Sequence, residues 1–178
     1  MRRLMMMAGA LGVVLVMSSG AFAQVPPDPN NPNEKVPEKA NFLPYGAPIS
    51  LAEAKKAAAA AIDEATKRGW PMCVAVVSPS GQLVYFEKMD DCQYASIDIS
   101  QHKARAAARF RRPTVVFERL LGKGDFFAYL PTLGDAFIAS RGGNPIVVRG
   151  KIIGAIGASG GTGAQDDLIS QAGAAALK

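Results

Sequence analysis

The sequence is poor in the residues that build metal centres and covalent cross-links. Its 178 residues include two cysteines, Cys73 and Cys92, and one histidine, His102. A structural zinc site takes four ligands, so these three residues cannot complete one without carboxylates. Cys73 opens an expected strand and Cys92 lies just past the hairpin partner of that strand. A disulfide between them requires the Cys92 loop to fold back; the alternative is two thiols, buried or partly exposed.

The chain also lacks a block of like charges. The formal net charge is +5, and the basic residues are spread along the sequence. Proteins that bind nucleic acid through its phosphates gather lysine and arginine into patches. The charge pattern therefore gives no reason to expect a nucleic-acid partner.

The apolar run near the N-terminus is too short for a spanning helix. It covers residues 4–17, follows Arg2 and Arg3, and precedes a small-x-small site at residues 21–23. This pattern is typical of a secretory signal peptide over residues 1–23, cleaved after Ala23. We expect a periplasmic or secreted protein, in which oxidising conditions permit a disulfide. The alternative is an uncleaved membrane anchor.

Seven prolines crowd the stretch that follows, and residues 24–49 are expected to form a linker. Proline at this density excludes helix and interior strand. The linker is interpreted as a tether to a surface, a strap across a neighbouring subunit, or a plain disordered leader. The folded domain is expected over residues 50–178.

Hydrophobic patterning predicts a mixed α/β domain. Ser50 and Glu53 form a capping box before a helix that ends at Gly69. Two hairpins are predicted from paired apolar runs, at residues 72–77 with 82–88 and at 145–148 with 151–157. Further helices are expected at residues 96–110, 115–121 and after residue 163. Hairpins favour an antiparallel sheet covered by helices.

A glycine-rich loop, residues 159–163, joins the last strand to the last helix. Strand, glycine loop and helix is the arrangement of an anion-binding loop. The loop has no lysine, and Asp166 and Asp167 in the first turn of the helix would repel a phosphate. We therefore predict a scaffold loop that holds no phosphate.

One helix face carries the strongest candidate for ligand binding. Asp98, His102, Arg105, Arg109 and Arg112 are spaced by four, three, four and three residues, so they share one stripe. Such a stripe suits haem, with His102 on the iron and the arginines on the propionates. The alternatives are a solvated or subunit-contact face, or a histidine base, for which no nucleophile is evident.

Aromatic residues gather in the irregular stretch after this helix, residues 122–143. Phe126 and Phe127 are candidates for the wall of an apolar ligand pocket. Aromatic residues below a loop are also common in ordinary cores. On the loop before the helix, Cys92 and Met89 are further soft-ligand candidates for a metal.

From residue 51 to residue 177 the chain resembles the GlcG/HbpS haem-binding family, also described as a haem-degrading domain (DUF336). The matching pieces are AIDEATKRGWPMCVAVVSPSGQLVYFEKMDD, ASIDISQHKARAAARFRRPT, GGNPIVVRGKIIGAIGASGGTGAQDD and AGAAAL. The resemblance implies a single α/β domain with an antiparallel sheet of about five strands flanked by helices, like a profilin or PAS sandwich. It also implies homo-oligomers, and it makes Thr114, in the RRPT piece, a further candidate ligand near haem.

These observations predict an exported haem-binding protein for haem storage, scavenging or redox sensing, with no established catalysis. Its predicted partners are haem or a small carboxylate, further copies of itself, and a sensor or membrane protein. One alternative is an enzyme or accessory protein acting on small hydroxy or keto acids such as glycolate, with the same arginines holding the carboxylate. Another is a structural or sensor-partner oligomer whose arginine stripe is only an interface.

Overall fold

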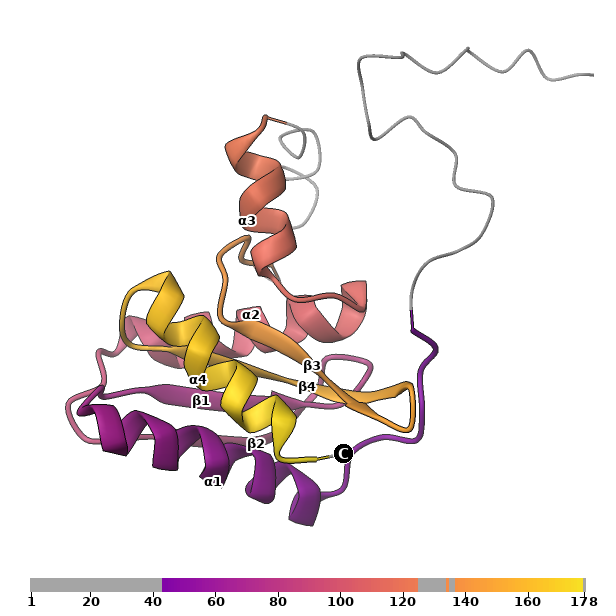
Figure 1. The fold of residues 1–178 in the computed structure, drawn as a ribbon, viewed down its shortest axis with the longest axis horizontal. Coiled ribbons are helices and arrows are strands. Elements are labelled where there is room, and N and C mark those ends of the chain that lie inside the picture. The colour runs from indigo at the N-terminus through magenta and orange to yellow at the C-terminus, as the bar shows by residue number, and fades with distance from the viewer. Residues whose placement is uncertain (1–42, 125–133, 135–136, 178) are drawn as a thin grey trace, which may run out of the picture. The chain divides into compact units, whose positions relative to one another are not determined.

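A computed structural model of the chain describes residues 43–124, 134 and 137–177. The predicted signal peptide, most of the predicted linker, and Phe126 and Phe127 lie outside these residues. The elements, in chain order, are α1 (Leu51–Arg68), β1 (Cys73–Val77), β2 (Leu83–Lys88), α2 (Ala95–Phe110), α3 (Val115–Gly122), β3 (Gly143–Val148), β4 (Lys151–Ser159) and α4 (Gly163–Ala175) (Figure 1). The predicted α/β class and the two hairpins are confirmed.

The sheet is antiparallel throughout and runs in the order β2-β1-β4-β3. Within the described residues it has four strands, against the five or so expected. The stretch before α1 adds one parallel bridge, between Tyr45 and Ile152, instead of a full strand. Pro44 and Pro48 lack the backbone N–H that a continuous ladder needs.

Residues 44–49 nevertheless lie along the beginning of β4. The Ile152 N–H donates to the Pro44 carbonyl at 2.9 Å, and the Gly46 N–H donates back to Ile152 at 2.8 Å. The Ile49 N–H donates to Ile153 at 2.7 Å, and the Ile49 side chain is buried in the core. This part of the predicted linker therefore packs as part of the domain.

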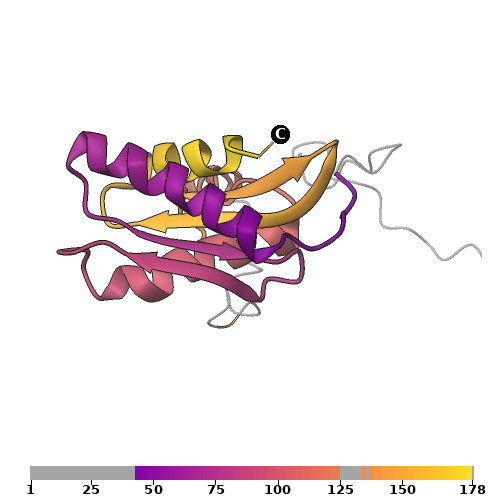
Figure 2. The ribbon, with the colours of Figure 1, turned by 90° about the horizontal axis from the view of Figure 1, so that it is seen from below.

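Helices cover both faces of the sheet. Figure 2 shows α1 and α4 on one face and α2 on the other. The strand pleat sends alternate residues to each side. Val74 and Val76 of β1 pack with the alanines of α1, whereas Ala75 and Val77 pack with those of α2. The core is thus two thin apolar layers, one on each face.

Small residues allow the helices to approach closely. A Cβ at Gly157 of β4 would collide with the backbone of Ser100 and of Ala104 in α2. A Cβ at Gly173 of α4 would meet Ile156 and the backbone of Ala57 in α1. Glycine at these positions fixes the spacing between the layers.

The helix boundaries follow local capping. Ser50 and Glu53 form the predicted capping box of α1, and Gly69 ends the helix in the left-handed region at φ 65°. Tyr94 precedes α2 without a side-chain cap. Across the parts of the chain that the structure describes, we find no helix with the length and hydrophobicity to cross a membrane.

Candidate functional site

The arginine stripe of α2 lies against the turn between β1 and β2. Arg105 Nε donates to the Gly81 carbonyl at 3.3 Å, and Arg109 Nε donates to the Ser80 carbonyl at 3.0 Å. A Cβ at Gly81 would lie 2.8 Å from each of these two side chains, so the turn packs directly on them. Two of the three predicted propionate ligands therefore hold a hairpin turn. The third, Arg112, donates to the Phe110 carbonyl at 3.1 Å.

The candidate iron ligands do not meet at one point. His102 is half-buried in the middle of α2, Cys92 lies before the helix and Thr114 lies after it. The helix has 16 residues, which corresponds to a length of about 24 Å. Cys92 and Thr114 therefore cannot ligate the same iron.

The side chains of Thr114 and Met89 are already engaged in hydrogen bonds within the domain. The Thr114 hydroxyl is buried, accepts from the Gly143 N–H at 2.9 Å and donates to the Gly143 carbonyl at 3.4 Å. The Met89 sulfur accepts from the Met72 N–H at 3.4 Å. In the described ranges, no cluster of three or more histidine, cysteine, aspartate or glutamate side chains is arranged to hold a metal ion.

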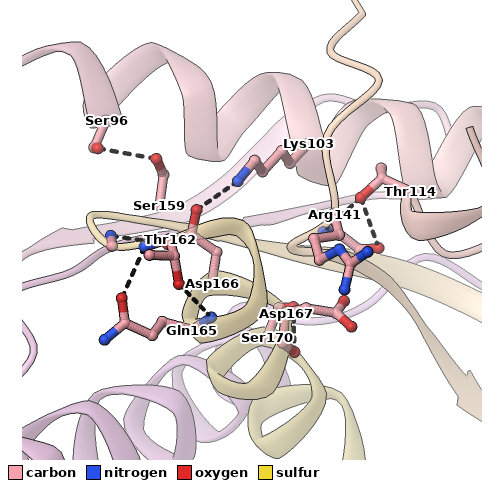
Figure 3. Close-up of polar contacts among 12 residues, drawn as sticks. Ser96, Lys103, Thr114, Arg141, Ser159, Thr162, Gln165, Asp166, Asp167 and Ser170 are labelled. Atoms are coloured by element: carbon pink, nitrogen blue, oxygen red, sulfur yellow. Dashed lines mark hydrogen bonds and ion pairs between the residues drawn. The ribbon is translucent and has the colours of Figure 1, made fainter. Parts of the chain in front are cut away.

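A buried ion pair joins α2 to α4, and the sequence patterns did not predict it. Lys103 Nζ of α2 lies 2.6 Å from Asp166 Oδ2 of α4, with the two side chains 2% and 4% exposed (Figure 3). Lys103 sits among the apolar residues of the buried face of α2. A lysine on that face was the available signal, but its partner is 63 residues away.

The same aspartate organises the glycine loop. Asp166 Oδ1 accepts from the Gly161 N–H at 3.0 Å, and the Gln165 side chain accepts from the Thr162 N–H at 2.8 Å (Figure 3). Thr162 and Gln165 complete a capping box at the start of α4. Two loop N–H groups that a phosphate would need are thus used by side chains of the following helix. This supports the interpretation of the loop as a scaffold.

A second polar group lies between β3 and α4. Asn144 Nδ2 donates to Asp167 Oδ1 at 3.1 Å and to Ser170 Oγ at 2.8 Å. Gln171 Nε2 donates to Asp167 Oδ2 at 2.7 Å. These bonds attach the edge strand β3 to α4 and leave Asn144 and Gln171 at the margin of a groove.

This groove has a volume of about 470 Å³ and mostly apolar walls. It is lined by Leu43, Arg111, Pro113, Asn144, Pro145, Val147, Gln171, Ala174, Ala175 and Leu177. Small-molecule sites in proteins are typically of this size and character, with few polar groups. Arg111 is the charged residue among these ten, and its guanidinium lies 5.0 Å from the centre of the Tyr45 ring. The groove is thus an apolar slot with a cation at its edge.

The groove meets some of the requirements of haem but not all. Haem needs apolar enclosure of the macrocycle and partners for its anionic propionates, and the walls and Arg111 provide both kinds of contact. None of the ten lining residues is a histidine, cysteine, methionine or tyrosine. The groove itself therefore offers no strong iron ligand.

Glu118 of α3 orders the chain just before β3. Its carboxylate accepts from the Arg141 backbone N–H at 2.9 Å and from Arg141 Nε at 2.6 Å. The hydrogen bond from the Arg141 side chain lowers the pKa of Glu118, against the effect of partial burial. Because Glu118 occupies the Arg141 guanidinium, this pair gives no open anion site.

Cys73 and Cys92 are both buried, and both thiols are free in this structure. Burial, together with the hydrogen bond to the Cys92 thiol, raises the pKa of the Cys73 thiol to about 12.

Comparison with known proteins identifies the family. Residues 49–175 match the family described as haem degrading protein HbpS-like. The chain is 42% identical over 102 residues to protein GlcG of Escherichia coli K12, which covers 57% of this chain and 73% of GlcG.

Solved structures share the fold. A double mutant of Streptomyces reticuli HbpS matches with a TM-score of 0.67 and 28% identity, over 81% of this chain and 97% of that one. A crystal structure of the PduOC–haem complex matches with a TM-score of 0.68 and 24% identity, over 74% and 96% of the two chains. That protein binds haem. With the family match over most of its length, the present chain belongs to the HbpS-like family, whose homologues include GlcG.

Proposed function

We propose that this chain is an exported haem-binding protein that holds haem in the groove between β3 and α4. The observation that carries the proposal is the groove itself, where apolar walls are combined with the Arg111 guanidinium. Membership of the HbpS-like family and the haem complex of PduOC support it. The signal-like N-terminus supports export.

The ten lining residues provide binding without strong iron ligation. Leu43, Val147 and Leu177 offer apolar surface to the macrocycle. Removing this surface from water on binding contributes to the affinity. Arg111 donates charge-assisted hydrogen bonds to a propionate, while Tyr45 stacks on the guanidinium and orients it. We infer storage, scavenging or sensing of haem, because the groove offers apolar contact and a cation for a propionate.

A haemin titration tests the proposal. The full chain should give a Soret band that saturates at stoichiometric haemin. Arg111→Ala should weaken the affinity about tenfold, the effect of losing one charge-assisted contact. Arg109→Ala is the matched control, because Arg109 contacts the Ser80 carbonyl and is not among the groove residues. A Soret band that stays that of free haemin at micromolar haemin would overturn the proposal.

Two other outcomes would relocate the site. If Arg111→Ala and Arg109→Ala lost affinity equally, the propionates would not be bound by Arg111 in the groove. A Soret band that shifts in His102→Ala would move the iron to α2, as the sequence pattern predicts.

The alternative function, in hydroxy-acid metabolism, rests on Arg105 and Arg109. Both side chains donate to carbonyls of the β1–β2 turn. A thermal shift with glycolate that disappears in Arg105→Ala would favour this alternative over haem binding.

A further inference from the structure

The two cysteines meet at the end of β4. Cys73 is the first residue of β1 and lies directly opposite Ser159 in the antiparallel pair. Cys92 Sγ lies 3.7 Å from the carbonyl oxygen of the same Ser159. The two cysteine residues are 0% and 4% exposed, and a hydrogen bond joins their side chains.

The loop that carries Cys92 is already folded back over β1. The Met89 N–H donates to the Met72 carbonyl at 3.0 Å, and the Cys92 N–H donates to the Met89 carbonyl at 3.3 Å. The Met72 N–H in turn donates to the Met89 sulfur at 3.4 Å. These bonds hold the Cys92 loop beside the start of β1.

Burial determines when such a bond can form. The high pKa of Cys73 keeps this residue almost entirely in the thiol form at neutral pH. Neither thiol is open to a bulky oxidant once β1, β4 and the loop have packed. Oxidation therefore has to take place while the chain folds.

We propose that Cys73 and Cys92 form a structural disulfide, made during folding by exchange with a disulfide donor. The Cys92 thiolate attacks one sulfur of the donor, a mixed disulfide forms, and the donor releases its other sulfur as a thiolate. The Cys73 thiolate then attacks Cys92 Sγ and expels the second donor sulfur. The two cysteine thiols lose two protons and two electrons, and the donor is reduced to two thiols.

The bond would compensate for a weak start to α2. Tyr94 provides no side-chain cap there, and the Ser96 and Ser159 hydroxyls share a hydrogen bond of 2.9 Å at the same place. A covalent link from the loop to β1 restrains the first turn of α2 against the sheet. This role does not depend on haem binding.

Refolding in a glutathione buffer tests the proposal. The full chain is unfolded, reduced, refolded with oxidised and reduced glutathione, and then alkylated. Mass spectrometry should show a chain two hydrogens lighter, without adducts, and a peptide that joins Cys73 to Cys92. The bond should persist in excess reduced glutathione. A second sample is unfolded in denaturant, reduced and refolded without the disulfide. Its Tm should be lower than that of the oxidised chain by roughly 10 °C.

The contrary results are equally clear. Two alkylated thiols, or glutathione adducts at equilibrium in a chain whose circular dichroism shows the fold, would overturn the proposal. An unchanged Tm on reduction would overturn the structural role. Cys92→Ser should have the same Tm as the reduced chain. A Tm for Cys92→Ser equal to that of the oxidised chain would also contradict the structural role.

Discussion

Lys103 and Asp166 form an ion pair between helices that lie on opposite faces of the sheet. Removing two charges from water costs several kcal/mol per ion, and good geometry has to offset that cost. Asp166 uses both oxygens, one for Lys103 at 2.6 Å and the other for the Gly161 N–H at 3.0 Å. The pair therefore joins α2 to α4 and also sets the glycine loop.

Breaking this pair should leave an uncompensated buried charge. We expect Lys103→Met to lower the free energy of unfolding by about 3–5 kcal/mol, measured by urea denaturation. Adding Asp166→Asn should recover a large part of the loss, because the amide oxygen still accepts from Gly161. Lys67→Met is the control; Lys67 lies 4.0 Å from Glu64 and is 73% exposed, so the change should be within about 0.5 kcal/mol. A loss in Lys103→Met no larger than the control would contradict this account.

Individual residues also show which features can be predicted from sequence patterns. The capping box of Ser50 and Glu53 and the Gly69 stop are local signals, and the structure confirms them. The stripe of His102, Arg105 and Arg109 is equally regular, but regular spacing says only that residues share a face. What covers that face is a tertiary fact, and for Arg105 and Arg109 it is the β1–β2 turn.

Among the secondary-structure elements, α2 packs especially closely on the sheet. Gly157 of β4 lies directly under α2, and a Cβ there would collide with the Ser100 and Ala104 backbone. The helix cannot retreat easily, because Tyr45 donates to the Ala108 carbonyl at 3.1 Å and Arg105 donates to the turn. The element is held between the sheet, the turn and the stretch before α1.

We therefore expect Gly157→Ala to destabilise the fold by about 3 kcal/mol, because the added methyl group has to displace backbone. Gly122→Ala, at the end of α3, is the matched control. A Cβ at Gly122 meets nothing within 4 Å, so the change should be neutral or stabilise by up to about 1 kcal/mol. Thermal and urea unfolding measure both variants. Equal stability of the two variants would contradict the close packing of α2.

The hairpins and helices could be predicted because their signals are local, whereas the strand order could not. Each hairpin follows from two apolar runs and a turn. The central pairing of β1 with β4 joins segments about 80 residues apart, and no turn residue encodes it. The short parallel bridge at Tyr45 could not be predicted either, because the proline-rich stretch that contains it is typical of a linker.

At the scale of the whole domain, the groove is assembled from four separate segments. Leu43 precedes α1, Arg111 and Pro113 connect α2 to α3, Asn144 belongs to β3, and Gln171 belongs to α4. No window of sequence contains the groove, whereas the stripe of α2 lies within one helix and is therefore the stronger local signal. The family match places the chain in a haem-binding domain family, and the groove is the place where we propose that haem binds.

Blocking the groove is the most direct test of haem binding at this place. Haemin is titrated into the wild-type chain and into Ala175→Trp, which puts an indole on the groove wall. Ala59→Trp on α1 is the matched control, because Ala59 is an exposed helical alanine outside the groove. The account predicts that Ala59→Trp keeps the wild-type Soret band and affinity, and that Ala175→Trp loses at least about tenfold in affinity. Wild-type affinity in Ala175→Trp would contradict the assignment of haem to the groove.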